Sequence, residues 1–303
     1  MATLPQKIIH RYLRRNKKFP HVWCLGCTNG IVLGSLIRAI AEMQLEKDNV
    51  TLVSGIGCSS RMPVYVDFNT CHSLHGRPIP FATGIKFFKP EQNVIVVTGD
   101  GDATAIGGNH FIHACRKNLD ITILILNNWI YGMTGGQASP TTPISGVTTT
   151  TPHGNIDPVF DICKLAIGAG ATFVARATAF HTLETTKVIK EAVSHKGVSV
   201  VEIVSTCHVS YGKMNKKGGA PDMLRWLKDN SISMAEAEKL EPEKKEGKII
   251  RGILHKEIQP EYCERYQALC DSFQESEKKE ATASSLATAT TPVNNEKKEE
   301  DKK

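Results

Sequence analysis

Short runs of apolar residues alternate along this chain with longer segments in which apolar residues recur at helical spacing. The short runs predict buried strands over 50–54, 94–98, 121–126, 171–175 and 198–204. The helical spacing predicts helices over 28–43, 106–117, 157–169 and 181–195. Residues 62–90 show weak periodicity and predict loops with a short helix. This alternation indicates an α/β fold, a parallel sheet with helices on both faces.

The C-terminal part differs in composition from the body of the chain. From about residue 212 we predict a helical extension of the body. Residues 277–303 are rich in Ala, Thr, Glu and Lys and contain almost no large apolar side chains. Such a segment cannot bury a core, so we expect one domain over 1–276 and a disordered tail over 277–303.

Glycine and polar residues directly follow four of the predicted strands. These segments are Gly57-Cys58, Gly99-Asp100-Gly101, Asn127-Asn128 and Cys207. Ligands of open parallel sheets bind beyond the carboxyl ends of the strands, which lie at one edge. We therefore expect the four segments to converge there.

The segment Gly99-Asp100-Gly101-Asp102 lies between a predicted strand and a predicted helix. Its glycines allow a close backbone approach to a ligand, and a helix N-terminus favours phosphate. The two carboxylates would repel a bare pyrophosphate, but a bound Mg²⁺ reverses this effect. The motif GDG, followed after 25 residues by NN, resembles the signature of thiamine diphosphate enzymes. Either motif alone fits an ordinary tight turn equally well.

The chain has nine cysteines, an odd number that argues against a disulfide framework. Cys24 and Cys27 form a C-x-x-C pair before a predicted helix, and Cys58 and Cys207 follow strands at the same edge. Four thiolates suit either zinc or a [4Fe–4S] cluster, and four scattered buried thiols remain the alternative. Oxidation of a thiamine-bound substrate needs an electron acceptor, which favours the cluster because zinc has no redox chemistry.

Charge and composition narrow the possible partners. The formal net charge is +6 over 303 residues, which fits an anionic ligand or an acidic protein partner. The basic clusters lack interleaved aromatic residues, so nucleic-acid binding is not expected. No run of about 18 apolar residues predicts a membrane span, and no apolar signal segment follows the start. A cytoplasmic protein is therefore expected.

Several longer motifs together are similar to one enzyme family. They are WCLGC, SGIGCSSR, HSLHGR, FATGIK, GDGDATAIGGNHFIHACR, LNNWIYGMTGGQASPTTP and CHVSYG. Over about residues 24–212 this set resembles the β subunit of 2-oxoacid:ferredoxin oxidoreductases, most closely the 2-oxoglutarate type. Leu25 and Thr28 depart from the family's more common C-P-G-C-G form, although both thiolates remain.

The resemblance implies an activity, cofactors and partners. The reaction would be oxidative decarboxylation of 2-oxoglutarate with coenzyme A to succinyl-CoA and CO₂, or its reverse, with electrons passing through one [4Fe–4S] cluster to ferredoxin. The cofactors would be thiamine diphosphate and Mg²⁺, and an α subunit would supply the glutamate beside the pyrimidine ring and the coenzyme A site. Three alternatives stay open: a pyruvate or branched-chain substrate, a non-oxidative decarboxylase with structural zinc, and a non-catalytic scaffold subunit.

The resemblance also implies roles for individual residues. The cluster ligands would be Cys24, Cys27, Cys58 and Cys207, and the Mg²⁺ ligands Asp100, Asn128 and the carbonyl of Ile130. The cofactor-binding residues would be Gly57, Cys58, Ser59, His75, Gly99, Asp100, Gly101, Asp102, Asn128, Ile130, Gly132, Met133 and Thr134. Catalytic roles are expected for Arg61, His75, Met133 and Thr134, with His72 near the reacting carbon and Arg61 on the oxo-acid carboxylate. Lys213, Lys216 and Lys217 are expected to help dock an acidic ferredoxin.

Overall fold

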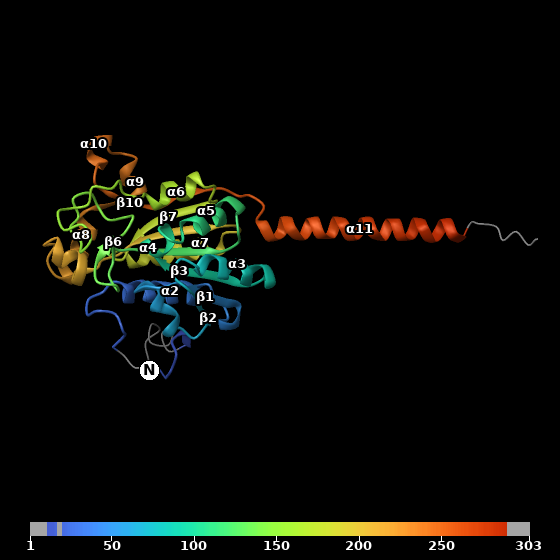
Figure 1. Ribbon diagram of the computed structural model, residues 1–303, viewed down its shortest axis with the longest axis horizontal. Helices are drawn as coiled ribbons and strands as arrows, with labels where there is room; N and C mark the ends of the chain where they lie inside the picture. Colours follow the sequence, from blue (N-terminus) through green and yellow to red (C-terminus); the bar gives the residue numbers. More distant parts are fainter. Residues whose placement is uncertain (1–10, 17–19, 290–303) are drawn as a thin grey trace, which may run out of the picture. The chain divides into compact units, whose positions relative to one another are not determined.

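The computed structural model describes residues 11–16 and 20–289. The chain divides into two compact units, Met1–Cys263 and Glu264–Lys303. The described strands and helices α2 to α10 all lie in the first unit (Figure 1). The division falls inside the stretch that we predicted as one domain over 1–276.

An eight-stranded sheet forms the centre of the first unit. Its strands are β1 (Val50–Ser54), β2 (Asn69–His72), β3 (Asn93–Gly99), β4 (Thr122–Asn127), β7 (Phe173–Thr178), β8 (Ser199–Val204), β9 (Ser231–Ser233) and β10 (Ile249–Lys256). Their spatial order is β2-β1-β3-β4-β8-β7-β10-β9. Neighbouring strands are parallel except β7 and β10, which pair antiparallel. The predicted α/β fold is confirmed.

Helices cover both faces of this sheet (Figure 1). Helices α2 (Asn29–Glu42) and α7 (Thr182–Ser194) pack on one face, and α3 (Pro78–Phe88), α5 (Gly108–Lys117) and α6 (Ile162–Gly168) pack on the other. Leu52 and Val53 are neighbours in β1 and enter different core clusters, because successive side chains of a strand point to opposite faces. Burial on both faces explains why these strands read as continuous apolar runs.

Three predicted elements differ from the structure. Residues 62–90, where we expected loops with a short helix, contain the 11-residue helix α3 and also strand β2, which we did not expect. The residues of β2 are mostly polar and lie at the sheet edge, so they leave no apolar run. The helix predicted over 157–169 begins only at Ile162, because the Asp161 carboxylate caps the backbone N–H groups of Cys163 and Lys164. Strand β7 begins two residues later than the predicted 171–175 run and extends to Thr178.

Short elements connect these strands and helices. They are η1 (Lys47–Asn49), η2 (Ser59–Val64), α4 (Asp100–Thr104) and the hairpin strands β5 (Ile130–Tyr131) and β6 (Gln137–Ala138). The helix predicted over 106–117 is preceded by α4, which starts directly at the acidic glycine loop.

The C-terminal extension is not purely helical, which corrects our prediction. It contains the π-helix η3 (His208–Gly212), α8 (Ala220–Asp229), α9 (Met234–Ala237) and α10 (Pro242–Lys245), together with the sheet strands β9 and β10. Strand β9 has three residues between charged segments, and Arg251 and Gly252 interrupt the apolar residues of β10.

The segment predicted as a disordered tail is helical as far as the structure describes it. Helix α11 spans Tyr262–Ala289, and residues 290–303 lie outside the described residues. Ala, Glu and Lys favour helices through local hydrogen bonding alone, without a buried core. No helix among the described residues is both long and apolar enough to cross a bilayer.

Candidate active site

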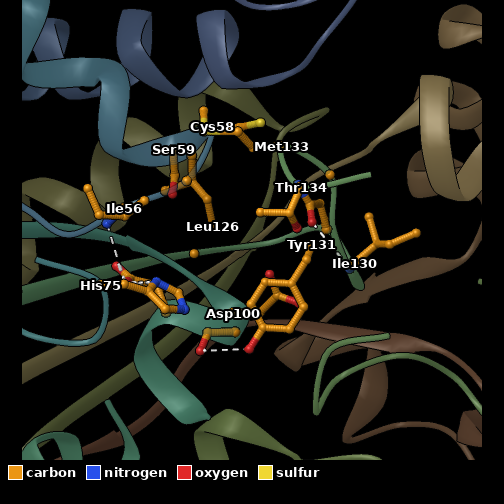
Figure 2. Close-up of a pocket in the computed structure, with 16 residues that line it drawn as sticks. Ile56, Cys58, Ser59, His75, Asp100, Leu126, Ile130, Tyr131, Met133 and Thr134 are labelled. Atoms are coloured by element: carbon orange, nitrogen blue, oxygen red, sulfur yellow. Dashed lines mark hydrogen bonds and ion pairs between the residues drawn. The ribbon is translucent and has the colours of Figure 1, made fainter. Parts of the chain in front are cut away.

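A cavity of about 270 Å³ lies beyond the carboxyl ends of β1, β3 and β4 (Figure 2). All the residues that we predicted to bind the cofactor line it, from Gly57 through the acidic glycine loop to Thr134. The segments that follow three strands therefore converge, as the strand order predicted. Their binding roles remain predictions.

Three further residues line this cavity that the sequence did not single out: Ile56, Leu126 and Tyr131. The Tyr131 hydroxyl donates to the backbone carbonyl of Gly101 at 3.2 Å. A Cβ on Gly101 would overlap the Tyr131 ring, so only glycine fits there. Burial, and then the charges of Asp100 and Asp102, raise the pKa of Tyr131 to about 12, so the phenol stays a neutral donor.

Asp100 is buried at the start of α4, with 3% of its surface exposed. Its Oδ2 accepts hydrogen bonds from Ser139 Oγ at 2.5 Å and Thr141 Oγ1 at 2.7 Å. Burial raises the pKa of Asp100, whereas these hydrogen bonds lower it. Such a carboxylate is stabilised as an anion by a bound cation.

The oxygen atoms around Asp100 fit a magnesium ion. Asn128 Oδ1 accepts from the backbone N–H of Ile130 at 3.3 Å, so the amide and the Ile130 carbonyl belong to one turn. Carboxylate, amide and carbonyl oxygens are the donor types that Mg²⁺ accepts. Among the described residues that line the cavity there is no lysine or arginine. A diphosphate there needs a metal ion as its counter-charge, and Asp100, Asn128 and Ile130 could hold it.

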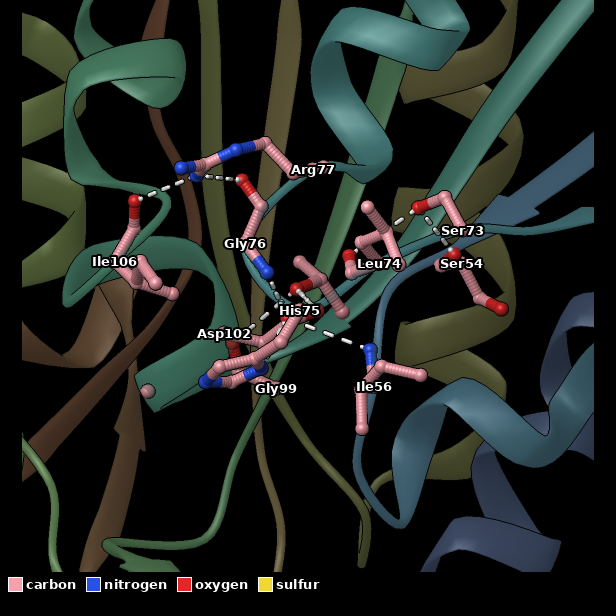
Figure 3. Close-up of polar contacts among 12 residues, drawn as sticks. Ser54, Ile56, Ser73, Leu74, His75, Gly76, Arg77, Gly99, Asp102 and Ile106 are labelled. Atoms are coloured by element: carbon pink, nitrogen blue, oxygen red, sulfur yellow. Dashed lines mark hydrogen bonds and ion pairs between the residues drawn. The ribbon is translucent and has the colours of Figure 1, made fainter.

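The carboxylate of Asp102 is directed into the neighbouring loop (Figure 3). Its Oδ1 lies 2.7 Å from His75 Nδ1 and accepts the backbone N–H of Gly76 at 2.6 Å, and its Oδ2 accepts the Thr98 hydroxyl at 2.6 Å. Asp102 thereby fixes the His75 ring, which lines the cavity with 37% of its side chain exposed. With Nδ1 on Asp102, Nε2 is the nitrogen of His75 available to a ligand.

Two predicted residues lie away from the cofactor cavity. His72 is exposed on β2, where its Nδ1 lies 2.9 Å from Ser54 Oγ, and it does not line the cavity. Its expected place beside the reacting carbon stays a prediction. Arg61 is also exposed and lines a second cavity instead.

The second cavity brings the four predicted cluster cysteines together. Cys24, Cys27, Cys58 and Cys207 all line it, with Arg61 at its wall. Burial, with smaller effects from the neighbouring thiols, raises the pKa of Cys27 to about 12 and of Cys58 to about 11. Bound metal overcomes this cost, because ligation replaces the thiol proton. The residues present fit a four-thiolate metal group.

The two cavities share part of their lining. Cys58, Asn128, Gly132 and Met133 line both of them. Trp23 supports this boundary, since its Nε1 donates to the Cys58 carbonyl at 2.6 Å. The thiol site and the site for the cofactor therefore adjoin each other.

The fold and the site define a protein of the thiamine diphosphate-binding class. Residues 55–203 match the family model described as "Thiamine pyrophosphate enzyme, C-terminal TPP binding domain". A more specific assignment comes from individual relatives.

The chain is 46% identical over 263 residues to the 2-oxoglutarate synthase subunit KorB of Methanocaldococcus jannaschii, covering 87% of this chain and 97% of that one. It is 47% identical over 271 residues to the KorB subunit of Archaeoglobus fulgidus, covering 88% and 96%. A solved 2-oxoglutarate:ferredoxin oxidoreductase from Magnetococcus marinus, with 2-oxoglutarate, coenzyme A and succinyl-CoA bound, matches with a TM-score of 0.78 and 30% identity, covering 94% and 96%. The chain belongs to the family of KorB subunits, the β subunits of 2-oxoglutarate synthases, which confirms the family predicted from the motifs.

Proposed function

We propose that this chain is the β subunit of an oxidoreductase that converts 2-oxoglutarate and coenzyme A into succinyl-CoA and CO₂, with ferredoxin as electron acceptor. The names of its relatives and the ligands of the solved neighbour support the substrate. The observation that carries the proposal is the shared lining of the two cavities at Cys58, Asn128, Gly132 and Met133. Electrons from an oxidised substrate need an acceptor at short range, and the four-cysteine cavity would hold it there.

Thiamine diphosphate, when bound, supplies the nucleophilic carbon for the oxo group and the electron sink for decarboxylation. Asp100, Asn128 and the Ile130 carbonyl would hold Mg²⁺ against its diphosphate. The missing side chain at Gly101 makes room for the Tyr131 ring in the cavity wall, and a Cβ at Gly99 would meet Ser59 Oγ at 3.3 Å.

His75 is the side chain best placed to handle a proton near the oxo group. Its Nδ1 lies 2.7 Å from Asp102 Oδ1, and its ring lines the cavity. The neutral Tyr131 phenol lies beside it, with the two ring centroids 6.1 Å apart. Met133 and Thr134 close the same wall of the cavity.

Cys24, Cys27, Cys58 and Cys207 would hold one [4Fe–4S] cluster. Zinc fits four thiolates equally well as a ligand set, but it cannot accept electrons. The adjoining cofactor cavity therefore favours the cluster over structural zinc. Arg61 lies beside the cluster cavity, so its predicted contact with the substrate carboxylate requires the guanidinium to reach past Cys58.

Two protein partners follow from this arrangement. Among the described residues that line the cofactor cavity there is no glutamate, so the carboxylate beside the aminopyrimidine would come from an α subunit. Leu74 and Ile106 are 68% and 53% exposed next to the His75 loop and fit a covered surface. Ferredoxin would dock near Cys207, where η3 leads into the exposed Lys213, Lys216 and Lys217.

Reconstitution of the αβ complex tests this function. We expect reduction of ferredoxin coupled to succinyl-CoA formation, with a higher kcat/KM for 2-oxoglutarate than for pyruvate or branched-chain oxo acids. Asp100→Ala should abolish the reaction. CO₂ release without ferredoxin reduction would favour a non-oxidative decarboxylase, and an Asp100→Ala complex as active as wild type would favour a scaffold subunit.

A further inference from the structure

A buried ion pair joins two neighbouring strands of the central sheet, and the proposed function gives it no role. Glu202 on β8 and Arg176 on β7 are register partners, and Arg176 Nε lies 2.6 Å from Glu202 Oε2. Their side chains are 5% and 16% exposed. A buried ion pair is a weak source of stability, because the cost of removing both charges from water offsets their attraction. The pair therefore calls for a role other than stability.

The Glu202 carboxylate fixes the orientation of one amide at the end of the next strand. Its Oε1 accepts a hydrogen bond from Asn127 Nδ2 at 2.8 Å. This leaves Asn127 Oδ1 to accept the backbone N–H of Trp129 at 3.2 Å. It also faces Thr141 Oγ1 at 2.9 Å and shares the single proton of that hydroxyl with Asp100 Oδ2. A flipped amide would lose both of these contacts.

Both contacts of Asn127 Oδ1 lead to the predicted Mg²⁺ ligands. Trp129 has a φ of 65°, a left-handed conformation that a non-glycine residue adopts only when its surroundings enforce it. It lies between Asn128 and Ile130, so its N–H bond to Asn127 holds the turn that carries two ligands. The Thr141 hydroxyl also lies 2.7 Å from Asp100 Oδ2, the third ligand residue.

The acidic and thiol groups near the pair are already engaged with Arg176 and with one another. Asp161, Cys163 and Glu202 offer ligand atoms within 4.8 Å of one another. Arg176 pairs with both carboxylates, with Nη2 2.7 Å from Asp161 Oδ1 in addition to its bond to Glu202. Burial and the Glu202 charge raise the pKa of the Cys163 thiol well above its ordinary value, so it donates to Glu202 at 3.3 Å as a neutral group.

We propose that Glu202, held by Arg176, is a positioning residue for the magnesium site. It acts through Asn127, which sets the 128–130 turn and the Thr141 contact on Asp100. The inference rests on the proposed Mg²⁺ and thiamine diphosphate binding. It adds Asn127, which contacts Thr141 and the turn that carries two ligands, and Glu202, which contacts Asn127. Partners of metal ligands typically change metal affinity by about 10–100-fold when they are removed.

The test is the affinity of the αβ complex for Mg²⁺, measured by calorimetric titration after chelation, with thiamine diphosphate present and no substrate. For Glu202→Gln we expect Mg²⁺ binding weaker by about 10-fold or more, with unchanged far-UV circular dichroism and cluster absorbance. The control is Glu184→Gln, which breaks a partly buried carboxylate–guanidinium pair with Arg251 on β10. We expect it to keep the wild-type Mg²⁺ affinity.

Equal Mg²⁺ affinity in Glu202→Gln and wild type, or equal weakening in both variants, would overturn the proposal. If Glu202→Gln does not fold, Asn127→Ala tests the same link with the ion pair intact, and a wild-type affinity there also overturns it. If both single variants fold, the double variant Glu202→Gln/Asn127→Ala should lose less Mg²⁺ affinity than the two single fold-losses multiplied together. The reason is that the two residues act through the same series of contacts. Failure of the wild-type complex to bind Mg²⁺ and thiamine diphosphate would instead contradict the proposed function.

Discussion

At Gly101, packing against Tyr131 in the cofactor cavity allows no side chain. Its Cα faces the Tyr131 ring at the start of α4, where any side chain would collide. Gly84 offers a contrast, because a Cβ there meets nothing within 4 Å in the helix α3. The two glycines therefore predict opposite outcomes for the same substitution.

Gly101→Ala should displace Tyr131 and weaken thiamine diphosphate binding by about 10-fold or more, because the overlapping ring moves into the cavity. Gly84→Ala should raise the free energy of unfolding by about 0.4–1 kcal/mol, because alanine suits a helix interior better. Cofactor titration and urea unfolding of both variants check this. Wild-type cofactor affinity in Gly101→Ala contradicts the assigned role of the loop.

The buried thiols predict a pH dependence for the cluster-free chain. The pKa of Cys27 is raised by burial from 9.0 to about 12. Its neutral form therefore stabilises the folded state fully below pH 9. This contribution is lost as the pH rises toward about 12, at up to about 1.4 kcal/mol per pH unit. In urea unfolding between pH 8 and pH 11, the free energy of unfolding should fall less steeply with pH for Cys27→Ser than for wild type. Identical pH dependence in the two proteins would contradict the burial of Cys27.

At the scale of elements, the sequence predicts best the strands that are buried on both faces. β1, β3, β4 and β8 appear as continuous apolar runs, and the loops that follow three of them meet at one edge as expected. β2 and β9 were missed because they are short edge strands with polar or charged residues. β10 was missed because Arg251 and Gly252 interrupt its apolar residues. The bridging role of Asp102 was missed because the direction of its carboxylate depends on the fold of the 75–76 loop.

Helix α11 was missed by the sequence prediction for a different reason. Its composition excludes a core but not a helix, and the prediction considered only the core. All residues of both cavities belong to the unit that ends at Cys263. A chain that ends at residue 263 should therefore bind thiamine diphosphate and iron as the full chain does. Cofactor titration and iron analysis measure this, and loss of either ligand would assign α11 a part in the site.

At the scale of the whole molecule, the positive charge favours an acidic electron carrier. Exposed Lys213, Lys216 and Lys217 follow Cys207 closely in the chain. Changing these three residues to alanine should lower kcat/KM for ferredoxin by about 3–10-fold at low ionic strength, because Coulomb attraction speeds encounter. The loss should shrink as salt screens the charges.

A matched triple change at the exposed Lys187, Lys239 and Lys244 removes the same charge elsewhere on the surface. It should leave both the rate and its salt dependence close to wild type. If the Lys213, Lys216 and Lys217 variant also keeps the wild-type kcat/KM for ferredoxin and its wild-type salt dependence, ferredoxin docks elsewhere.

The central claim is that an electron carrier adjoins the thiamine site inside this chain. Anaerobic purification with iron, sulfide and zinc analysis and an absorption spectrum tests it most directly. We expect a brown protein with about four irons per chain. We also expect that Cys207→Ser loses the colour and the iron but still binds thiamine diphosphate. A colourless protein with one zinc per chain would contradict the claim, because the site would then have no path for electrons.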